Sequence, residues 1–145
     1  MLRVGNSGTW GGGLFTSSPI RNGAIIYDFA HCSPSPVATY RTIQVGIAVH
    51  MDDRELVGYL NHMCRPNAFV HAETLTVRAA RDILAGEELG FFYPSTEWDM
   101  ARPFQCACGA AECIGLVAGA KHLSESMLSR YFINPHIREL RSAWR

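Results

Sequence analysis

The sequence predicts a mainly β protein that ends in short helices. Residues 40–49 and 69–80 alternate apolar and polar side chains over short runs, which is typical of strands and hairpins. Turns rich in glycine and proline separate such runs. A helical period appears only beyond residue 113. Strands are therefore expected through most of the chain, and helices only near its C-terminal end.

Length and composition favour one globular domain. The chain has 145 residues, of which 48% are hydrophobic and 18% charged, so it is neither disordered nor large enough for a second sizeable core. No stretch approaches the roughly 18 apolar residues of a membrane span, and residues 1–3 open no signal peptide. We expect a cytoplasmic protein, or a nuclear one if the source is eukaryotic or delivers the protein into a host, with no membrane partner.

The charge balance predicts no direct nucleic-acid partner. Thirteen basic and thirteen acidic residues cancel, so no bulk field draws the chain onto a phosphate backbone. The distribution is uneven, because residues 50–120 hold ten acidic residues against five arginines. An acidic middle would suit a basic peptide substrate, although a solvated surface is the ordinary explanation of such charges.

The N-terminal part reads as short strands joined by turns. Residues 2–4 are a candidate strand, and residues 8–15 are so rich in glycine that the backbone must bend sharply or meet a ligand closely. Residues 19–28 follow, with Pro19 and Gly23 ahead of a short apolar run. Residues 30–39 contain two prolines and are expected to form a loop.

Three helical segments are expected later in the chain. A helical turn is expected over 52–56, after the first hairpin. One face of a helix would carry Leu123, Met127, Leu128 and Tyr131. Pro135 should break that helix, and a second short helix is expected over 136–144.

The cysteines point to a metal site. Five cysteines are an odd number, which argues against a fully paired disulfide framework. Cys106, Cys108 and Cys113 offer three thiolates from one tight loop, and Cys64 is a plausible fourth ligand for tetrahedral zinc. Reduced cysteines in a cytosolic core are the alternative, which the spacing disfavours. Cys32 is left over as a small buried hydrophobe.

Two polar segments precede that cluster. Asn61-His62-Met63-Cys64-Arg65-Pro66-Asn67 places polar side chains on an irregular backbone, and Gly86-Glu87-Glu88-Leu89-Gly90-Phe91-Phe92-Tyr93 ends a strand on a tyrosine. Each alone has an ordinary explanation, as a hydrogen-bonded turn or as packing. Taken with the cysteines, residues 8–115 resemble the SET-domain family, most of whose members are S-adenosylmethionine-dependent protein lysine methyltransferases.

The resemblance implies a fold and a domain division. SET domains consist of several small sheets with a knot-like crossing of the chain. Residues 1–105 would form the SET domain, 106–120 a post-SET zinc-binding segment, and 121–145 a helical extension. The same resemblance completes one structural zinc site per chain from Cys64, Cys106, Cys108 and Cys113, which would clamp the C-terminal segment onto the core.

The resemblance also implies an active site. The cofactor-binding residues would be Gly11, Gly12, Gly13, Asn61, His62, Tyr93 and Phe104. Tyr93 would be the catalytic residue, and Phe91 would line the substrate channel with it and influence the methylation number. The sequence departs from the family pattern at Gly12, where relatives often carry Trp or Arg, and at Met63, Phe92 and Pro94.

The expected activity is transfer of a methyl group from S-adenosylmethionine to a lysine side chain of a protein, with histones among the candidates. Glu87 and Glu88 would be solvated or ion-paired. Two alternatives stay open: a small amine or metabolite as substrate, and a catalytically inactive SET scaffold that binds the cofactor or a partner. An exposed edge strand would favour a peptide substrate, and a closed pocket would favour a metabolite.

Overall fold

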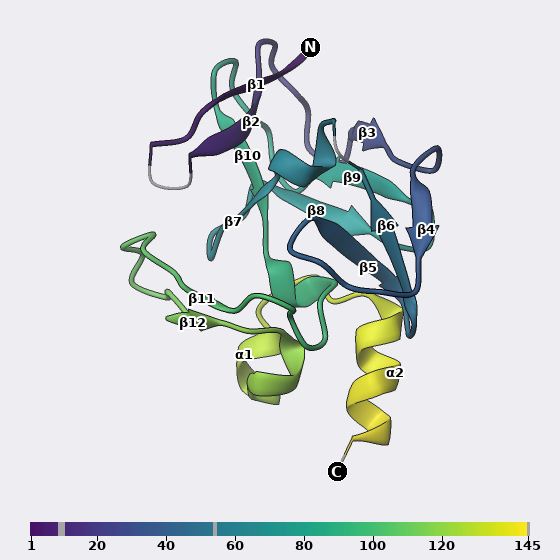
Figure 1. Ribbon diagram of the computed structural model, residues 1–145. Coiled ribbons are helices and arrows are strands. Elements are labelled where there is room, and N and C mark those ends of the chain that lie inside the picture. Colours follow the sequence, from purple (N-terminus) through teal and green to yellow (C-terminus); the bar gives the residue numbers. More distant parts are fainter. Residues whose placement is uncertain (9–10, 54, 145) are drawn as a thin grey trace.

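The computed structural model describes residues 1–8, 11–53 and 55–144, and these form twelve short strands in four small sheets. Three of the sheets lie in the upper part of Figure 1, the two-stranded sheet lies lower, and the two α-helices lie at the bottom. The mainly β fold with short C-terminal helices is therefore confirmed, with several small sheets instead of one large one.

The first sheet carries the two motif segments. Its strands, in spatial order, are β1 (Leu2–Asn6), β2 (Gly12–Thr16), β10 (Glu88–Phe91) and β7 (Asn61–His62). β10 runs antiparallel to β2 but parallel to β7, so Asn61 lies beside Gly90 and His62 beside Phe91. Residues that are about thirty positions apart in the chain thereby become neighbours.

Three smaller sheets complete the fold. Their members, in spatial order, are β3 (Ile25–Asp28), β9 (Thr76–Ala79) and β8 (Ala68–His71); β4 (Ser33–Ser35), β6 (Val49–Asp52) and β5 (Thr42–Gly46); and β11 (Phe104–Gln105) with β12 (Leu116–Val117). Both predicted hairpins are present, as β5–β6 and β8–β9. The predicted loop over 30–39 was wrong in part, because the proline-containing β4 pairs as an edge strand with β6.

Two predicted turns lie partly outside the described residues. The glycine-rich turn over 8–15 includes residues 9–10, and the helical turn over 52–56 includes residue 54. Within the described part, Gly11 has a φ of +81°, a conformation that glycine adopts without strain. A 3₁₀ turn, η1, lies slightly later than the predicted turn, at Val57–Tyr59.

The C-terminal helices differ from the prediction in length. The helical elements after β12 are η3 (Ala120–His122), α1 (Glu125–Leu128) and α2 (Pro135–Ala143). The predicted helix from Leu123 is a single turn, because Leu123 is extended and the Ser124 side chain caps α1 by accepting from the Met127 N–H. Pro135 begins α2 and does not merely end the preceding helix, since proline is well suited to the first helical turn.

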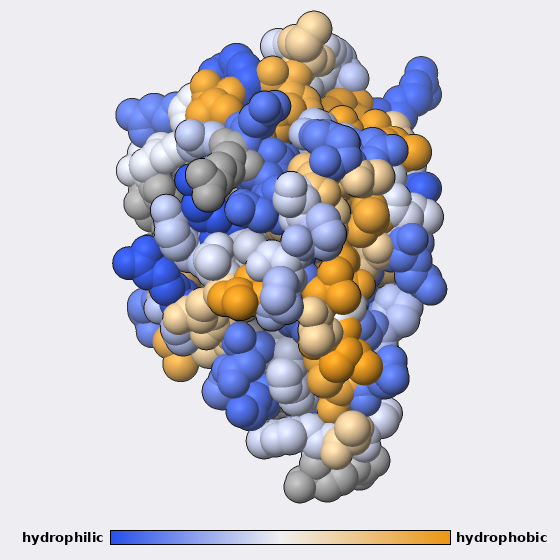
Figure 2. Space-filling model, turned by 45° about the vertical axis from the view of Figure 1, so that its right-hand side comes forward, coloured by the Kyte–Doolittle hydropathy of each residue, from blue (hydrophilic) through white to orange (hydrophobic). Residues whose placement is uncertain are grey.

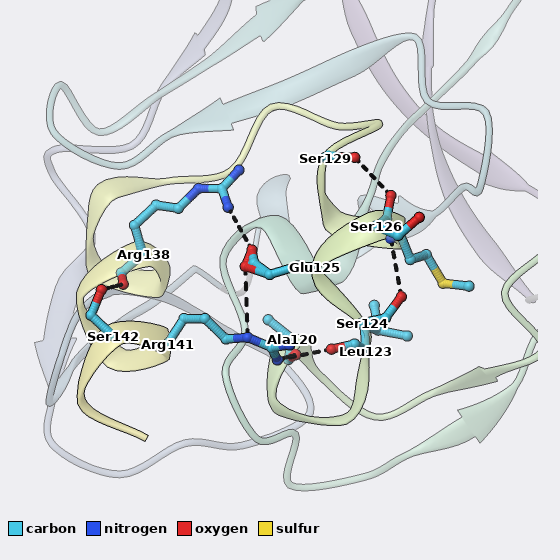
Figure 3. Close-up of polar contacts among 10 residues, drawn as sticks. Ala120, Leu123, Ser124, Glu125, Ser126, Ser129, Arg138, Arg141 and Ser142 are labelled. Atoms are coloured by element: carbon cyan, nitrogen blue, oxygen red, sulfur yellow. Dashed lines mark hydrogen bonds and ion pairs between the residues drawn. The ribbon is translucent and has the colours of Figure 1, made fainter. Parts of the chain in front are cut away.

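Ion pairs join the two α-helices. Glu125 of α1 points toward Arg138 and Arg141 of α2 (Figure 3), with N–O distances of 3.1 and 3.8 Å. Arg141 also donates to the backbone oxygens of Ala120 and Leu123. The ion pairs are largely exposed, so each is expected to contribute only about 0.2–1 kcal/mol.

Packing ties the C-terminal part to the rest of the chain. The main core is formed by buried residues of the sheets, with Leu14, Val70 and Leu89 among them. A second core places Ile137 of α2 against Phe92, which directly follows β10. We propose that 1–105, 106–120 and 121–145 are segments of one domain, because their side chains share these cores.

Asn134 is the main polar link in this packing. Its side chain is buried just before α2; Oδ1 accepts from the Ala72 N–H, and Nδ2 donates to the backbone oxygens of Val70 and Ser95. The amide thus satisfies the Val70 oxygen and the Ala72 N–H at the end of β8, and it shares the Ser95 oxygen with the Asn134 N–H.

Replacing Asn134 with alanine is expected to lower the free energy of unfolding by about 3 kcal/mol or more. Each buried backbone group left without a partner costs about 1–3 kcal/mol. Urea unfolding of both proteins measures the difference, and Asn22→Ala, at an exposed position, is the matched control. A loss below about 1 kcal/mol would show that water replaces the amide.

The surface carries both hydrophobic and polar residues. Hydrophobic and polar residues alternate in patches over the face that Figure 2 presents. In the described part of the chain, no helix combines the length and the apolar character needed to cross a bilayer.

Candidate functional site

One cavity of about 540 Å³ collects most of the residues predicted to bind the cofactor or the substrate. Its walls come from residues 39–43, 57–62 and 91–104, with Gly12 at one side. The predicted residues that line it are Gly12, Asn61, His62, Phe91, Tyr93 and Phe104. Gly11 and Gly13 are described but do not line it. The residues predicted to bind the cofactor or the substrate therefore meet in one cavity, except for two of the three glycines.

The glycines of β2 let the backbone lie close to its neighbours. A Cβ atom at Gly12 would come within 2.9 Å of the Tyr59 ring, and one at Gly13 would collide with the Glu88 carboxylate. A larger residue at either position would have to displace these side chains. Glycine at these positions therefore lets the Tyr59 ring and the Glu88 carboxylate pack directly on the β2 backbone, and Gly12 and Tyr59 both line the cavity.

Asn61 joins the strands that border the cavity. Its Nδ2 donates to the Gly12 oxygen at 2.9 Å and to Glu88 Oε1 at 3.0 Å. Its Oδ1 has no hydrogen-bond partner among the described residues. The amide nitrogen thus holds the cavity wall in place, and the amide oxygen is available to a bound molecule.

The imidazole of His62 is buried, with 2% of the residue exposed. Nδ1 accepts from the Tyr93 N–H at 3.2 Å, so Nε2 carries the proton that faces the Cys64 sulfur at 3.3 Å. Burial lowers the His62 pKa to about 4, which keeps the ring neutral. The side chain therefore positions Tyr93 and Cys64 relative to each other, and a cofactor would meet the His62 backbone.

Tyr93 follows β10 at the start of the 3₁₀ turn η2 (Tyr93–Ser95). Its hydroxyl donates to the Leu60 oxygen at 2.8 Å. Burial and then the charges of Glu97 and Glu88 raise the Tyr93 pKa, so the phenol stays protonated. The hydrogen bond aims the hydroxyl, and its lone pairs remain available to a donor in the cavity.

Aromatic rings surround this hydroxyl. The centroids of Phe91 and Tyr93 are 4.9 Å apart, and Phe104 stands edge-on to Tyr93 at 6.0 Å. Phe104 belongs to β11, which the cysteine segment holds in place. Such rings make the cavity largely apolar around a few polar groups, as is usual for small-molecule sites.

Glu97 is a cavity residue that sequence reasoning missed. It lies one turn after Tyr93, and its N–H donates to the Tyr93 oxygen at 3.0 Å. Burial raises its carboxyl pKa to about 7. The four-residue spacing from Tyr93 was the available signal, but nothing in the sequence indicated that this acid would be half-buried at the cavity.

Of the two glutamates predicted to be solvated or ion-paired, Glu87 is ion-paired, whereas Glu88 is half-buried and bonded to an amide. Glu87 forms an ion pair with Arg81 at 2.7 Å, and this pairing lowers the Glu87 pKa to about 2. Glu88 accepts from Asn61, as described above. Cys32 is half-buried against the main core, away from the other cysteines, which agrees with a packing role except that its burial is incomplete.

The remaining four cysteines come together. The sulfurs of Cys64, Cys106, Cys108 and Cys113 all lie within 4.8 Å of one another, and those of Cys64 and Cys106 are 3.8 Å apart. A tetrahedral zinc with Zn–S bonds of about 2.3 Å requires sulfurs about 3.8 Å apart. The four sulfurs therefore fit a closed zinc site with no position left for a substrate.

The surroundings of the sulfurs suit thiolates held by a cation. The N–H groups of Ile114 and Ala110 donate to the sulfurs of Cys64 and Cys108, each at 3.5 Å. Burial raises the Cys64 pKa, whereas the bond from Ala110 lowers the Cys108 pKa. A bound metal would supply the positive charge that buried Cys64 otherwise lacks.

Comparison with known proteins decides the family. The SET-domain family model matches residues 11–94, more than half of the chain. This chain belongs to the SET-domain family. It is 42% identical over 120 residues to methyltransferase flvH of Aspergillus flavus, covering 81% of this chain and 67% of that protein. It is 30% identical to human histone-lysine N-methyltransferase 2B over 76% of this chain, but spans only 5% of that protein.

Solved SET-domain structures share the fold. The methyltransferase domain of human histone-lysine N-methyltransferase SETMAR superposes with a TM-score of 0.60 at 20% identity, over 81% of this chain and 58% of that one. KRYPTONITE, solved with mCHH DNA, an H3(1-15) peptide and SAH, superposes with a TM-score of 0.60 at 20% identity, over 79% of this chain and 29% of that one. The expected absence of a nucleic-acid partner gains no support, since that neighbour binds DNA.

Proposed function

We propose that this SET-domain protein transfers a methyl group from S-adenosylmethionine to the side-chain amine of lysine in a protein. The observation that carries the proposal is the cavity, which Tyr93, Asn61 and Gly12 line together. Relatives named as histone-lysine methyltransferases favour a histone substrate, and a histone substrate would place the protein in the nucleus.

The residues present fit the proposed cofactor. A volume of about 540 Å³ is within the usual range for small-molecule sites. The Gly12 backbone and the Asn61 oxygen would hold polar parts of the cofactor, the His62 backbone would border it, and the Phe104 ring would cover its adenine. Gly11 and Gly13 would act only by shaping the β2 backbone.

The chain would contribute alignment and an apolar environment. When bound, S-adenosylmethionine supplies a methyl group on a sulfonium, which is an excellent leaving group. Tyr93, aimed by its bond to Leu60, would orient the incoming amine. A free lysine amine has a pKa of about 10.4 and must lose its proton before it reacts. Burial between Phe91 and Tyr93 would favour the neutral amine and exclude water.

A zinc ion held by Cys64, Cys106, Cys108 and Cys113 would be structural in this proposal. Cys64 follows β7 at the cavity, whereas the other three ligands lie between β11 and β12. One ion would thus join the cavity wall to the segment that carries Phe104. A cross-link is expected to stabilise the folded chain most when it closes a long loop, as this one would.

A small amine is the second candidate substrate. The match to flvH is compatible with it, because that protein is named only as a methyltransferase, and this name specifies no protein substrate. The short β4–β6 sheet adds no long insert that would hold a peptide.

Mass spectrometry on purified protein with S-adenosylmethionine tests the proposal. The panel contains histone H3 and H4 tails, other basic peptides and small alkylamines. We expect a gain of one or more methyl groups on a lysine peptide. Methylation of an alkylamine alone would favour a small amine as the substrate. Methylation of no substrate would favour an inactive scaffold.

Asn61→Ala is expected to weaken S-adenosylhomocysteine binding about 10-fold or more. The change removes both the cavity-facing oxygen and the two hydrogen bonds that hold β2 and β10 beside β7. Calorimetry measures the affinity. Glu87→Gln, which removes the ion pair with Arg81 and keeps an acceptor for the Leu84 N–H, is the control and should bind as the parent does. Equal affinity of Asn61→Ala and the parent would contradict the assignment of Asn61 as a cofactor-binding residue.

A further inference from the structure

Glu97 is a carboxyl group in the cavity that the mechanism above does not use. Its Oε2 accepts from the Gln44 N–H at 2.9 Å and from the Thr96 hydroxyl at 2.7 Å. Gln44 is itself held, since its Oε1 accepts from the Trp98 N–H and its Nε2 donates to the Gly46 oxygen. The carboxyl group is therefore fixed in place through one oxygen.

The other oxygen, Oε1, has no hydrogen-bond partner among the described residues, and Glu97 forms no ion pair with any of them. A carboxylate removed from bulk water without a counter-charge is costly. Two arginines also line the cavity, but Arg102 lies over the Tyr40 ring at 5.0 Å, and Arg41 has contacts of its own. Nothing in the described structure neutralises Glu97, whereas a cationic ligand in the cavity would.

We propose that Glu97 binds the ammonium group of an alkylammonium substrate in the cavity and then takes its proton, so that this protein carries its own base. This inference rests on the methyl transfer proposed above. An N–H bond of the ammonium breaks, an O–H bond forms at Oε1, and both charges disappear. The nitrogen lone pair is then free for the methyl group, and the neutral pair suits the apolar cavity.

The carboxyl group is matched to this task. An ordinary glutamate, with a pKa near 4.3, is a weak base, but burial raises the Glu97 pKa to about 7. The other ionisable side chains at the cavity are Tyr40, Arg41, Tyr59, His62, Tyr93 and Arg102. His136 approaches from α2, where Nε2 bonds to the Thr96 oxygen, and burial lowers its pKa. Buried His62 has a lowered pKa and Tyr93 a raised one, so neither is suited to take the proton at neutral pH.

The test compares the parent with Glu97→Gln, which keeps an acceptor for Gln44 and Thr96 but loses the charge and the basic oxygen. Methylation of an H3 peptide and of n-butylamine is measured from pH 7 to pH 9.5. At pH 7 we expect kcat/KM to fall about 100-fold, within the range for general-base catalysis. The deficit should shrink to about 10-fold or less at pH 9.5, because amine that arrives neutral needs no base. The substrate whose methylation depends on Glu97 in this way shows whether the site takes a peptide lysine or a small amine.

Glu73→Gln, on the exposed turn between β8 and β9, is the matched control and should behave as the parent does. Equal rates in Glu97→Gln and the parent would overturn the proposal, and so would a loss that is the same at every pH.

A second measurement does not depend on turnover. NMR titration of the protein with n-butylammonium and with the neutral 1-pentanol should show a preference for the cation that Glu97→Gln abolishes. If the parent methylates nothing but shows this preference, the methyl-transfer function fails and the ammonium site stands. If the parent shows no preference for the cation, the ammonium site is wrong.

Discussion

Replacing Tyr93 with phenylalanine is expected to lower methyl-transfer turnover by about 10²–10⁴-fold, the range for positioned groups that handle protons. The hydroxyl is aimed by its bond to the Leu60 oxygen, and its raised pKa keeps it a neutral donor that can also accept. The ring contacts with Phe91 and Phe104 would survive in the variant. Affinity for S-adenosylhomocysteine should therefore change little. Single-turnover kinetics and calorimetry separate the two effects.

Tyr27→Phe is the matched control for this prediction. Tyr27 lies on β3 and its hydroxyl contacts His31, outside the residues that line the cavity. Its removal should leave turnover unchanged. If Tyr93→Phe turns over as fast as the parent, the catalytic assignment loses its basis, whereas loss of cofactor affinity together with turnover would indicate a role in cofactor binding.

Cys113→Ser is expected to release most of the zinc and to lower the free energy of unfolding by about 3 kcal/mol or more. Metal binding to a site that exists only in the folded chain is itself a contribution to folding, and loss of a metal is among the few single changes with effects this large. The melting temperature should fall by about 10 °C or more. Because Phe104 lies on the segment that the metal would hold, cofactor affinity should fall as well.

Elemental analysis of the purified parent should return one zinc equivalent per chain, and thermal unfolding measures the stability. Cys32→Ser is the control, since Cys32 lies outside the cysteine cluster and should leave the zinc content unchanged. A parent protein with far less than one zinc equivalent, and with Cys64 and Cys106 freely titratable, would contradict the proposed site.

Most strands were predictable because their signal is local. Alternation in 40–49 and 69–80 reflects side chains that face a core on one side, and both segments are hairpins. The β4 edge strand and the shortness of α1 were not predictable from periodicity. Pairing with β6 recruits β4 despite its proline, and the Ser124 cap begins a new helix where the apolar pattern suggested a continuous one.

Cysteine spacing predicted the candidate metal site, and the resemblance to the SET-domain family predicted the roles of Asn61, His62 and Tyr93. Both depend on the sequence alone, since thiolates and amides act through the same atoms in any fold. Only the tertiary structure decided which atoms face the cavity. The parallel pairing of β7 with β10 turns the His62 ring inward. It is also packing that half-buries Glu97 and leaves one of its oxygens without a partner among the described residues. The basicity of a carboxylate depends on the solvent around it, which residue order does not specify.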